Sequence, residues 1–377
     1  MITLLLSLTL LIPPAGALPA QNAADIVEAT ALMQAAGGGQ VELVRQLIAA
    51  GADVHVRTRS GTALMWAALY GHADVARILL AGGAAVDAPD KDGLTPLMVA
   101  AQEGRTDVVR VLLDAGASVT ARSKDSFTPL LLAASAGRAD SVRLLIDRGA
   151  EVDARGPDGA TAMLAAAYGG QREAAQALLA AHGDVKAADA QGRTPLMAAA
   201  FSGDVGIADA LLKGDVDLET LDKSGQTALT YAAALGHLDL GQRLVESGAK
   251  TGRGELLVAA AKQGRLRLVT LLLAQGLSVE TTNAAGDTPL VAAAFDDQTL
   301  VVDLLLERGA EVNAADGLGR TALMGAASSG NVGLVKTLIS KRADAEAYEK
   351  SGRTALSYAT RGGHEDVVKL LDAASKK

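Results

Sequence analysis

A short pattern of one polar residue followed by apolar residues recurs along the chain at a fixed interval. A threonine is followed by Pro or Ala, then by Leu or Met, and then by an alanine-rich run. Self-similarity at a fixed period of this length is the sequence signature of a repeat architecture. The threonines stand 33 residues apart within two runs, at Thr62, Thr95, Thr128, Thr161, Thr194 and Thr227 and again at Thr288, Thr321 and Thr354.

Two further units complete the series. Thr30 opens it, and Glu255 with Leu256 and Leu257 fills the slot between Thr227 and Thr288. The pattern therefore predicts eleven units over residues 25–377, within one repeat domain that we place at residues 21–377. No stretch of this range remains for a second kind of domain.

Each unit predicts two short helices and a loop. In the unit of Thr95 the threonine is a helix N-cap and Pro96 takes the first helical position, where its missing N–H costs nothing. A helix over 97–101 and a second over 107–113 follow, and the turn-rich stretch 117–126 predicts a projecting hairpin or loop. A glycine nine residues after the threonine ends the first helix, at Gly71, Gly104, Gly137, Gly170, Gly203, Gly236, Gly264, Gly330 and Gly363.

The amino-acid composition limits which kind of core the chain can form and which partners it can bind. Only 2% of the residues are aromatic although 49% are hydrophobic, so Ala, Leu and Val must form thin, close-packed layers. The absence of cysteine excludes disulfide scaffolds, iron–sulfur clusters and thiol nucleophiles. The net charge of −8 disfavours binding to phosphate groups, and we expect no nucleic-acid partner.

The leading segment indicates export. Residues 1–20 contain no ionisable side chain, and the apolar run 2–12 is followed by Pro13, Pro14 and Gly16. This pattern predicts a secretory signal peptide over residues 1–20 and a periplasmic or secreted protein. The run is too short to span a bilayer, so we expect no stable membrane span. Because the segment lacks a basic residue near its start, a misplaced start codon and an uncleaved interfacial anchor stay open as alternatives.

Motifs of catalysis and cofactor binding are weak. The glycines around Gly317 and Gly319 fall in repeat positions, and the carboxylates do not converge on one region as general acid–base catalysis requires. His72, His237 and His364 share a His-x-Asp spacing, but the first two are five repeats apart and cannot share a metal ion. We expect structural hydrogen bonds from these histidines, no cofactor, no metal and no enzymatic activity.

The repeated unit resembles the ankyrin repeat, and the resemblance covers nearly the whole chain after residue 24. It is carried by residues 90–101, with the sequence DKDGLTPLMVAA, and by residues 228–237, with the sequence ALTYAAALGH. The resemblance implies an α-solenoid, an array of stacked helix pairs with projecting β-hairpin loops and one concave surface. The histidine that the family carries after Thr-Pro-Leu is replaced here, for example by Met98 and Met197, so we expect apolar packing where that histidine would bond between repeats.

The resemblance also implies where a partner would bind. In the family, loop positions just before the threonine and the end of the first helix face the groove, and five of the nine aromatic residues occupy such slots. We expect Phe127, Tyr168 and Phe201 to form an aromatic ridge that contacts a protein or peptide. The other candidates are the aromatic residues Tyr70 and Phe295 and the charged rim residues Arg59, Lys91, Glu103, Lys124 and Arg193. The alternative is that the rings fold onto neighbouring helices and fill gaps between alanines.

One unit is irregular. The connection through residues 246–254 lacks five residues of the usual loop, and Asp297 stands where glycine would end the first helix of the next unit. These departures predict a notch in the groove, and a bend between repeats one to seven and eight to eleven.

Taken together, the sequence predicts a non-enzymatic, exported, monomeric scaffold that holds another protein or a peptide along its concave groove. The alternative function is a structural spacer or chaperone-like protective protein for an envelope enzyme. The sequence does not identify the partner.

Overall fold

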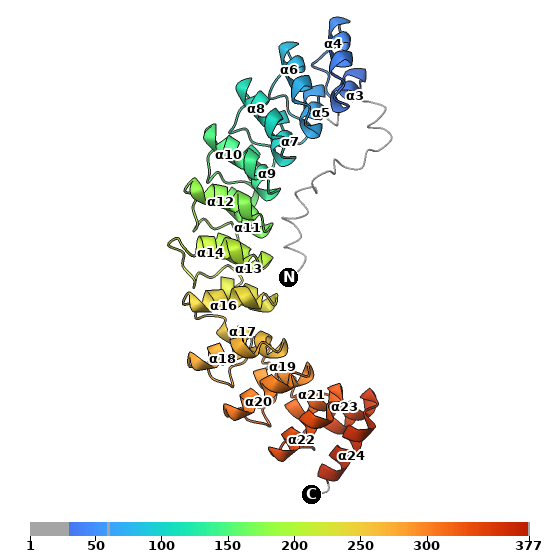
Figure 1. The fold of residues 1–377 in the computed structure, drawn as a ribbon, viewed down its shortest axis with the longest axis vertical. Coiled ribbons are helices and arrows are strands. Elements are labelled where there is room, and N and C mark those ends of the chain that lie inside the picture. Colours follow the sequence, from blue (N-terminus) through green and yellow to red (C-terminus); the bar gives the residue numbers. More distant parts are fainter. Residues whose placement is uncertain (1–29, 59–60, 376–377) are drawn as a thin grey trace. The chain divides into compact units, whose positions relative to one another are not determined.

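A computed structural model describes residues 30–58 and 61–375, so the predicted signal peptide lies outside the described residues. The described chain contains eleven pairs of short α-helices, as the repeat pattern predicts (Figure 1). By backbone contacts the chain divides into two compact units, residues 1–217 and 218–377. Six helix pairs belong to the first unit and five to the second.

In the first unit the helices are short and evenly sized. They are α3 (Ala31–Gly37), α4 (Val41–Ala49), α5 (Ala63–Tyr70), α6 (Ala73–Ala81), α7 (Pro96–Gln102), α8 (Thr106–Asp114), α9 (Pro129–Ser135), α10 (Ala139–Asp147), α11 (Ala162–Tyr168), α12 (Arg172–Ala180), α13 (Pro195–Ser202) and α14 (Val205–Leu211). A single 3₁₀ turn, η1 (Pro157–Gly159), lies in the loop before α11.

The second unit continues the same alternation. Its helices are α15 (Ala228–Ala234), α16 (Leu238–Glu246), α17 (Arg253–Lys262), α18 (Leu266–Ala274), α19 (Pro289–Phe295), α20 (Thr299–Glu307), α21 (Ala322–Ser329), α22 (Val332–Ser340), α23 (Ala355–Gly362) and α24 (Glu365–Ala374).

Within each unit the helices form two layers. The first helix of each pair packs against the first helices of the neighbouring pairs, and in the first unit the second helices pack in the same way (Figure 1). We call these the first-helix layer and the second-helix layer. Neither layer could bury its apolar face alone, which is why stacking stabilises the array.

The threonine slots begin the first helices as predicted. In nine of the eleven repeats a threonine Oγ1 accepts a hydrogen bond from the backbone N–H three residues on, at Thr30, Thr62, Thr95, Thr128, Thr161, Thr194, Thr227, Thr288 and Thr354. Such a cap contributes about 1 kcal/mol to helix stability. Thr321 also stands at the N-cap, but its buried Oγ1 makes no hydrogen bond.

The core is made of small side chains, as the low aromatic content predicts. Alanines of the first-helix layer such as Ala100, Ala101 and Ala134 are completely inaccessible to solvent. Met98 and Met197 occupy the histidine slot and are buried; their Sδ atoms accept weak hydrogen bonds from the backbone N–H groups of Thr95 and Thr194, each at 3.5 Å. Methionine thus fills space and also keeps a weak polar contact in this slot.

The loops differ from the expected β-hairpins. In the described residues they contain only isolated β-bridges, between Thr58 and Gly61, Ala315 and Thr321, and Tyr348 and Thr354. The residue five before the threonine closes most of these loops, by one backbone hydrogen bond to the residue before the threonine and often by its side chain as well. Asp189 shows the arrangement, since its Oδ1 accepts from the backbone N–H groups of Gln191 and Arg193 at 2.8 and 3.0 Å. The Asp side chain thus caps its own turn, beside a backbone hydrogen bond from Asp189 N–H to Arg193 O at 3.1 Å.

Side chains at the start of several second helices bond to the repeat before their own. His72 Nε2 lies 2.9 Å from the backbone oxygen of Gly37, and His364 Nε2 lies 3.1 Å from that of Ser328. Arg105 and Arg138 donate from Nε to backbone oxygens of the preceding repeat, each at 3.0 Å. His72 and His364 therefore have the structural role that the sequence predicts, and the bonds run between repeats.

Glycine slots that hold another residue keep the left-handed backbone. His182 (φ 60°), Asp297 (φ 58°) and Arg342 (φ 69°) occupy positions where other repeats have glycine. This conformation costs an ordinary L-residue about 1–2 kcal/mol. At Asp297 a hydrogen bond from Asn331 Nδ2 to Asp297 Oδ1, at 2.6 Å, offsets part of this conformational free energy.

The loop of repeat eight, the pair α17 and α18, is short. Residues 247–252 alone separate α16 from α17, whereas residues 275–288 separate α18 from α19. Its helix α17 begins at Arg253, ahead of the threonine slot at Glu255. Gly254 makes this possible, because a Cβ there would lie 2.7 Å from the backbone oxygen of Thr282 in the following loop. The bend that we expect here stays a prediction.

Candidate protein-binding surface

The sequence candidates fall on the first-helix layer and on the loops before it. Arg59 lies outside the described residues. Lys91 and Lys124 are exposed on consecutive loops, which are joined by a 3.0 Å hydrogen bond from Lys124 N to Asp92 O. Glu103 is half-buried at the end of α7. These three side chains are therefore accessible at the surface.

Phe127 does not lie on an exposed ridge, so the prediction for this residue is wrong. Its side chain is only 8% exposed and belongs to a core cluster with Met98, Leu131, Leu132 and Ala165. The backbone explains the burial, because Phe127 N–H donates to Ser123 Oγ at 3.1 Å and closes the loop. In this repeat the residue before the threonine therefore packs into the core beneath the loop.

Arg193 occupies the same slot and is also not a rim residue. It is 8% exposed and its Nη2 lies 2.6 Å from Oδ2 of Asp189, whose side chain is fully buried. The guanidinium also lies over the ring of Tyr168, 5.3 Å from the ring centroid. Arg193 is thus a structural side chain that joins the loop to the preceding repeat.

Tyr168 and Phe201 are brought together as expected. Their ring centroids are 5.7 Å apart with an interplanar angle of 67°, an edge-to-face contact between the ends of α11 and α13. Both side chains are half-buried, so one side of each remains accessible. Two of the three predicted ridge residues therefore form a fixed aromatic pair, which we call the Tyr168 pair.

Tyr70 is the most exposed of the candidate aromatic residues. It is 43% exposed at the end of α5, and its ring lies 6.4 Å from that of Trp66. Trp66 Nε1 is buried without a hydrogen-bond partner. Tyr70 therefore presents an aromatic surface on the first-helix layer, supported from beneath by Trp66.

Phe295 has the same kind of surroundings in the second unit. The Arg320 guanidinium lies 4.7 Å from its ring centroid, and Tyr358 contacts it edge-on at 5.8 Å. Arg320 Nε is 2.6 Å from Oδ2 of the buried Asp316. We did not predict these partners from the sequence. A sequence signal for them exists, since an acidic residue stands five before the threonine and an arginine one before it in both repeats, at Asp189 and Arg193 and at Asp316 and Arg320.

A third copy of this acid–arginine pair lies in repeat eleven. Glu349 accepts hydrogen bonds from Ser351 and from Arg353, whose guanidinium lies 5.0 Å from the Tyr358 ring centroid. The hydroxyl of Ser351 and then the guanidinium of Arg353 hold the pKa of Glu349 below its usual value. Burial, followed by the Glu349 charge, raises the pKa of Tyr358. The pair is therefore ionised and fixed at neutral pH.

An open hollow of about 680 Å³ lies on the first-helix layer of the second unit beside repeat eight, where the sequence predicts a notch, and we call it the repeat-eight notch. Helices α15, α17 and α19 form its walls together with the loop at residues 283–287. The chemistry of its lining comes from Leu235, Glu255, Val258, Lys262, Asp287, Val291, Phe295, Asp296, Asp316 and Arg320, among others.

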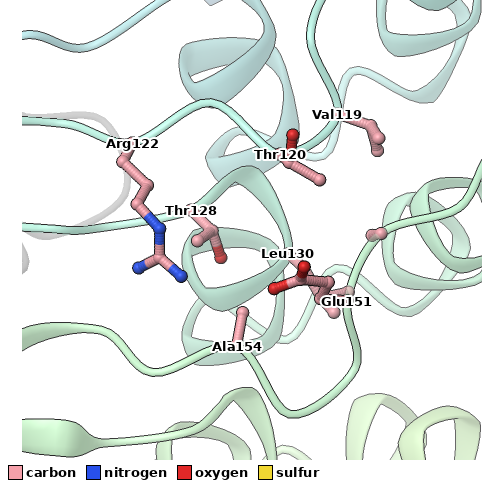
Figure 2. A pocket seen from close by; sticks show the side chains of 8 residues that line it. Val119, Thr120, Arg122, Thr128, Leu130, Glu151 and Ala154 are labelled. Carbon is pink, nitrogen blue, oxygen red and sulfur yellow. The ribbon is translucent and has the colours of Figure 1, made fainter.

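A second cavity is too small for any ligand. Figure 2 shows it between the loops of repeats four and five, with Arg122, Thr128 and Glu151 around it. Its volume is about 10 Å³, the space of one water molecule at most. This cavity is a packing defect between loops.

Within residues 30–58 and 61–375, no group of three or more His, Asp or Glu side chains could hold a metal ion. No helix in the same residues is long and apolar enough to cross a bilayer.

Comparison with known proteins agrees with the repeat pattern. The family model described as "Ankyrin repeats (3 copies)" matches residues 32–123, 120–189, 162–255, 250–316 and 313–376. Among solved structures, the crystal structure of the human ASB11 ankyrin repeat domain is similar, with a TM-score of 0.55 and 27% identity. The match covers 59% of this chain and 99% of that domain. A search of curated proteins found no match.

Proposed function

Because the chain belongs to the ankyrin repeat family, whose repeats generally mediate protein–protein interaction, we propose that it is a non-enzymatic scaffold that holds a protein partner against its first-helix layer. The binding surface consists of the aromatic side chains at the ends of the first helices and of the loop residues beside them. Tyr70, Tyr168, Phe201 and Phe295 supply the aromatic contacts, and Lys91, Glu103 and Lys124 supply charged contacts at the edge.

The Tyr168 pair is the observation that carries this proposal. Its two rings come from consecutive repeats and are held edge-to-face, and Arg193 lies over one of them. Half-buried rings that are already fixed lose little conformational freedom when a partner covers them. Aromatic side chains of this kind are enriched among the residues that dominate binding energy at interfaces.

The experiment is crosslinking of the tagged chain in its own host at native expression level, followed by quantitative mass spectrometry. We expect one partner in stoichiometric amount with the wild type, and its loss with the double variant Tyr168→Ala/Phe201→Ala. Leu43→Ala is the matched control, because Leu43 is an exposed apolar residue, 41% accessible, on the second-helix layer. Circular dichroism of each variant excludes unfolding as the cause of a loss.

Two results would contradict the proposal. A single partner that stays bound to the double variant would place the interface elsewhere. Many weakly held proteins in place of one would favour the alternative function, a structural spacer or chaperone-like protective protein for an envelope enzyme.

We further propose that the chain is exported and works as a periplasmic or secreted monomer. The support is the uncharged, apolar segment at residues 1–20. Sequencing of the N-terminus of the protein purified from the host should find that residues 1–20 have been removed. A protein that begins at Met1 would contradict cleavage, and sedimentation equilibrium at a dimer mass would contradict the monomer.

A further inference from the structure

The repeat-eight notch lies where one loop of the array is missing. Only residues 247–252 connect α16 to α17, whereas residues 275–288 connect α18 to α19. The lining of the notch reaches from Gln226, in the loop of repeat seven, to Asn283 and Ala284, in the loop of repeat nine. These two loops therefore border a hollow of about 680 Å³, a volume typical of pockets that hold a ligand.

The loops that are present share one turn. In five of them an Asp or Asn side-chain oxygen, five residues before the threonine slot, accepts from the backbone N–H groups two and four residues on, at 2.8–3.0 Å. These five residues are Asp90, Asp189, Asp222, Asn283 and Asp316. In eight described loops the residue two before the slot has positive φ, and in seven of these it is glycine. Both loops that border the notch have this turn, and repeat eight lacks it.

Consecutive loops are joined through their backbones. Ala190 N–H donates to Asp158 O at 2.7 Å, and Lys350 N–H donates to Leu318 O at 3.0 Å. In both cases the donor stands four residues before its own threonine, and the acceptor stands three residues before the threonine of the preceding repeat. A loop thus offers a backbone acceptor to the loop that follows it and a backbone donor to the loop that precedes it.

The loops beside the notch keep these groups without a loop between them. Ser224 stands three residues before Thr227, and Ala284 stands four residues before Thr288. In the described part of the chain the backbone oxygen of Ser224 accepts no hydrogen bond and the backbone N–H of Ala284 donates none. Both residues are exposed. An inserted turn could therefore bond to both neighbours as the loops of the array bond to one another.

Leu221 marks the open edge of the repeat-seven loop. It stands six residues before Thr227, and 55% of it is exposed. In the same slot of other repeats the side chains of Arg122 and Arg155 donate to backbone oxygens of the following loop. Leu221 faces the shortened connection of repeat eight in place of such a loop, so its apolar surface stays in water until another segment covers it.

We propose that a turn of the protein partner occupies the repeat-eight notch in place of the missing loop. This inference rests on the proposed function and names the segment that the partner presents. The turn has the sequence Asp/Asn-x-x-Gly, and an apolar residue beside it packs on Leu221. Its backbone donates to Ser224 O and accepts from Ala284 N–H. Main-chain hydrogen bonds supply affinity in such a contact, and the covered apolar residue supplies specificity.

Selection from a phage library of disulfide-closed random peptide loops, with the immobilised full-length chain as target, tests the proposal. The enriched peptides are synthesised with a fluorescent label, and their affinity is measured by polarisation. We expect a shared Asp/Asn-x-x-Gly sequence. The decisive variant fills the notch with a loop of the chain itself, because a copy of residues 311–320 replaces residues 250–254. This loop graft should weaken peptide binding by about 100-fold or more. Urea unfolding should show that the graft is as stable as the wild type.

A point variant tests the same site without an insertion. Leu221→Ala should weaken binding of the enriched peptides about tenfold, because it removes apolar surface that the turn covers. Tyr348→Ala is the matched control, since Tyr348 occupies the same slot in repeat eleven and is 74% exposed. It should leave the affinity unchanged.

Other results of these measurements would overturn the inference. They are the absence of any enriched peptide, enriched peptides without a shared turn, and equal affinity for the wild type and the loop graft. Sedimentation equilibrium at a dimer mass for the wild type and at a monomer mass for the graft would make a second copy of the chain the occupant, and would also overturn the partner turn.

Crosslinking in the host separates this inference from the proposed function. If the loop graft keeps the crosslinked partner and Tyr168→Ala/Phe201→Ala loses it, the proposed function stands and the inference fails. If the graft loses the partner and the double variant keeps it, the inference stands and the proposed interface fails. No enriched peptide together with no crosslinked partner would overturn both.

Discussion

The two compact units contain the same aromatic arrangement in different surroundings. In the first unit Arg193 joins Asp189 to the ring of Tyr168, and in the second Arg320 joins Asp316 to the ring of Phe295. The Arg193 side chain is 10% exposed, whereas that of Arg320 is 28% exposed and lines the repeat-eight notch. The repeat therefore fixes where the ring and the arginine lie, and the neighbouring loops decide how much of them a partner can reach.

The largest expected effect concerns the division between core and surface within the first unit. Phe127→Ala should lower the free energy of unfolding by about 3 kcal/mol, because it empties a buried position among Met98, Leu131 and Leu132. Phe201→Ala should cost about 1 kcal/mol, because its ring is half-buried. Urea unfolding followed by circular dichroism measures both, and equal losses would contradict the assignment of Phe201 to the surface.

The second prediction compares Asp189 and Asp316, the carboxylates that hold the two arginines. Asp189→Ala should cost about 3 kcal/mol, because it leaves the charge of Arg193 buried without its carboxylate. Asp316→Ala should cost less, about 2 kcal/mol, because Arg320 is more exposed and keeps Asp287 at 3.7 Å. Asp74→Ala, which breaks an exposed ion pair with Arg77, is the control and should change stability by less than about 0.5 kcal/mol. A larger loss for Asp316→Ala than for Asp189→Ala would reverse the comparison.

The third prediction tests whether the backbone of the glycine slot is the same in both units. His182→Gly in the first unit and Arg342→Gly in the second should each raise the free energy of unfolding by about 1 kcal/mol, because both positions have positive φ. Gly149→Ala is the opposite change in the same slot, where an added Cβ meets no atom within 4 Å, and it should lower stability by a similar amount. Differential scanning calorimetry compares the three, and a loss with either glycine variant would show that the replaced side chain stabilises the fold.

The smallest expected effect is a pH dependence in repeat eleven. Hydrogen bonds from Ser351 and Arg353 lower the pKa of folded Glu349, so its contribution to stability is complete above the usual glutamate pKa of about 4.3. That contribution falls as the pH drops through the lowered pKa of the folded state. The melting temperature of the wild type should therefore exceed that of Glu349→Gln at pH 7, and the difference should shrink toward pH 3. A difference that is constant over this range would show that the charge of Glu349 is not involved.

Much of the fold follows from the sequence because most of the eleven repeats carry the same local signals. Thr95 caps its helix, Pro96 starts it and Gly104 ends it in a left-handed conformation, all through contacts with near neighbours in the chain. Such local signals can be recognised in the amino-acid sequence alone. The predicted β-hairpins are reduced to isolated bridges in the described residues, because each loop is closed by one backbone bond and a turn, as at Asp189, and no strand of several residues forms.

The candidate site was harder to predict because it depends on contacts between repeats. Phe127 and Arg193 each stand one residue before the threonine, a position that the family exposes. Here Ser123 and Asp189 close the two loops, and the side chains of Phe127 and Arg193 are buried. The notch was expected from the missing loop residues. Its charge was not, since the carboxylates that line it come from repeats eight to ten and share one hollow only when those repeats are stacked.

Four of the bonds from the start of second helices run toward the N-terminal end of the chain. His72, Arg105 and Arg138 reach back to backbone oxygens of the preceding repeat, and His364 does the same in the last one. A ribosome makes the N-terminal repeat first, so every one of these acceptors is synthesised before its donor. Each of these four repeats thus emerges after the repeat on which it packs, and the array is suited to grow from its N-terminal end.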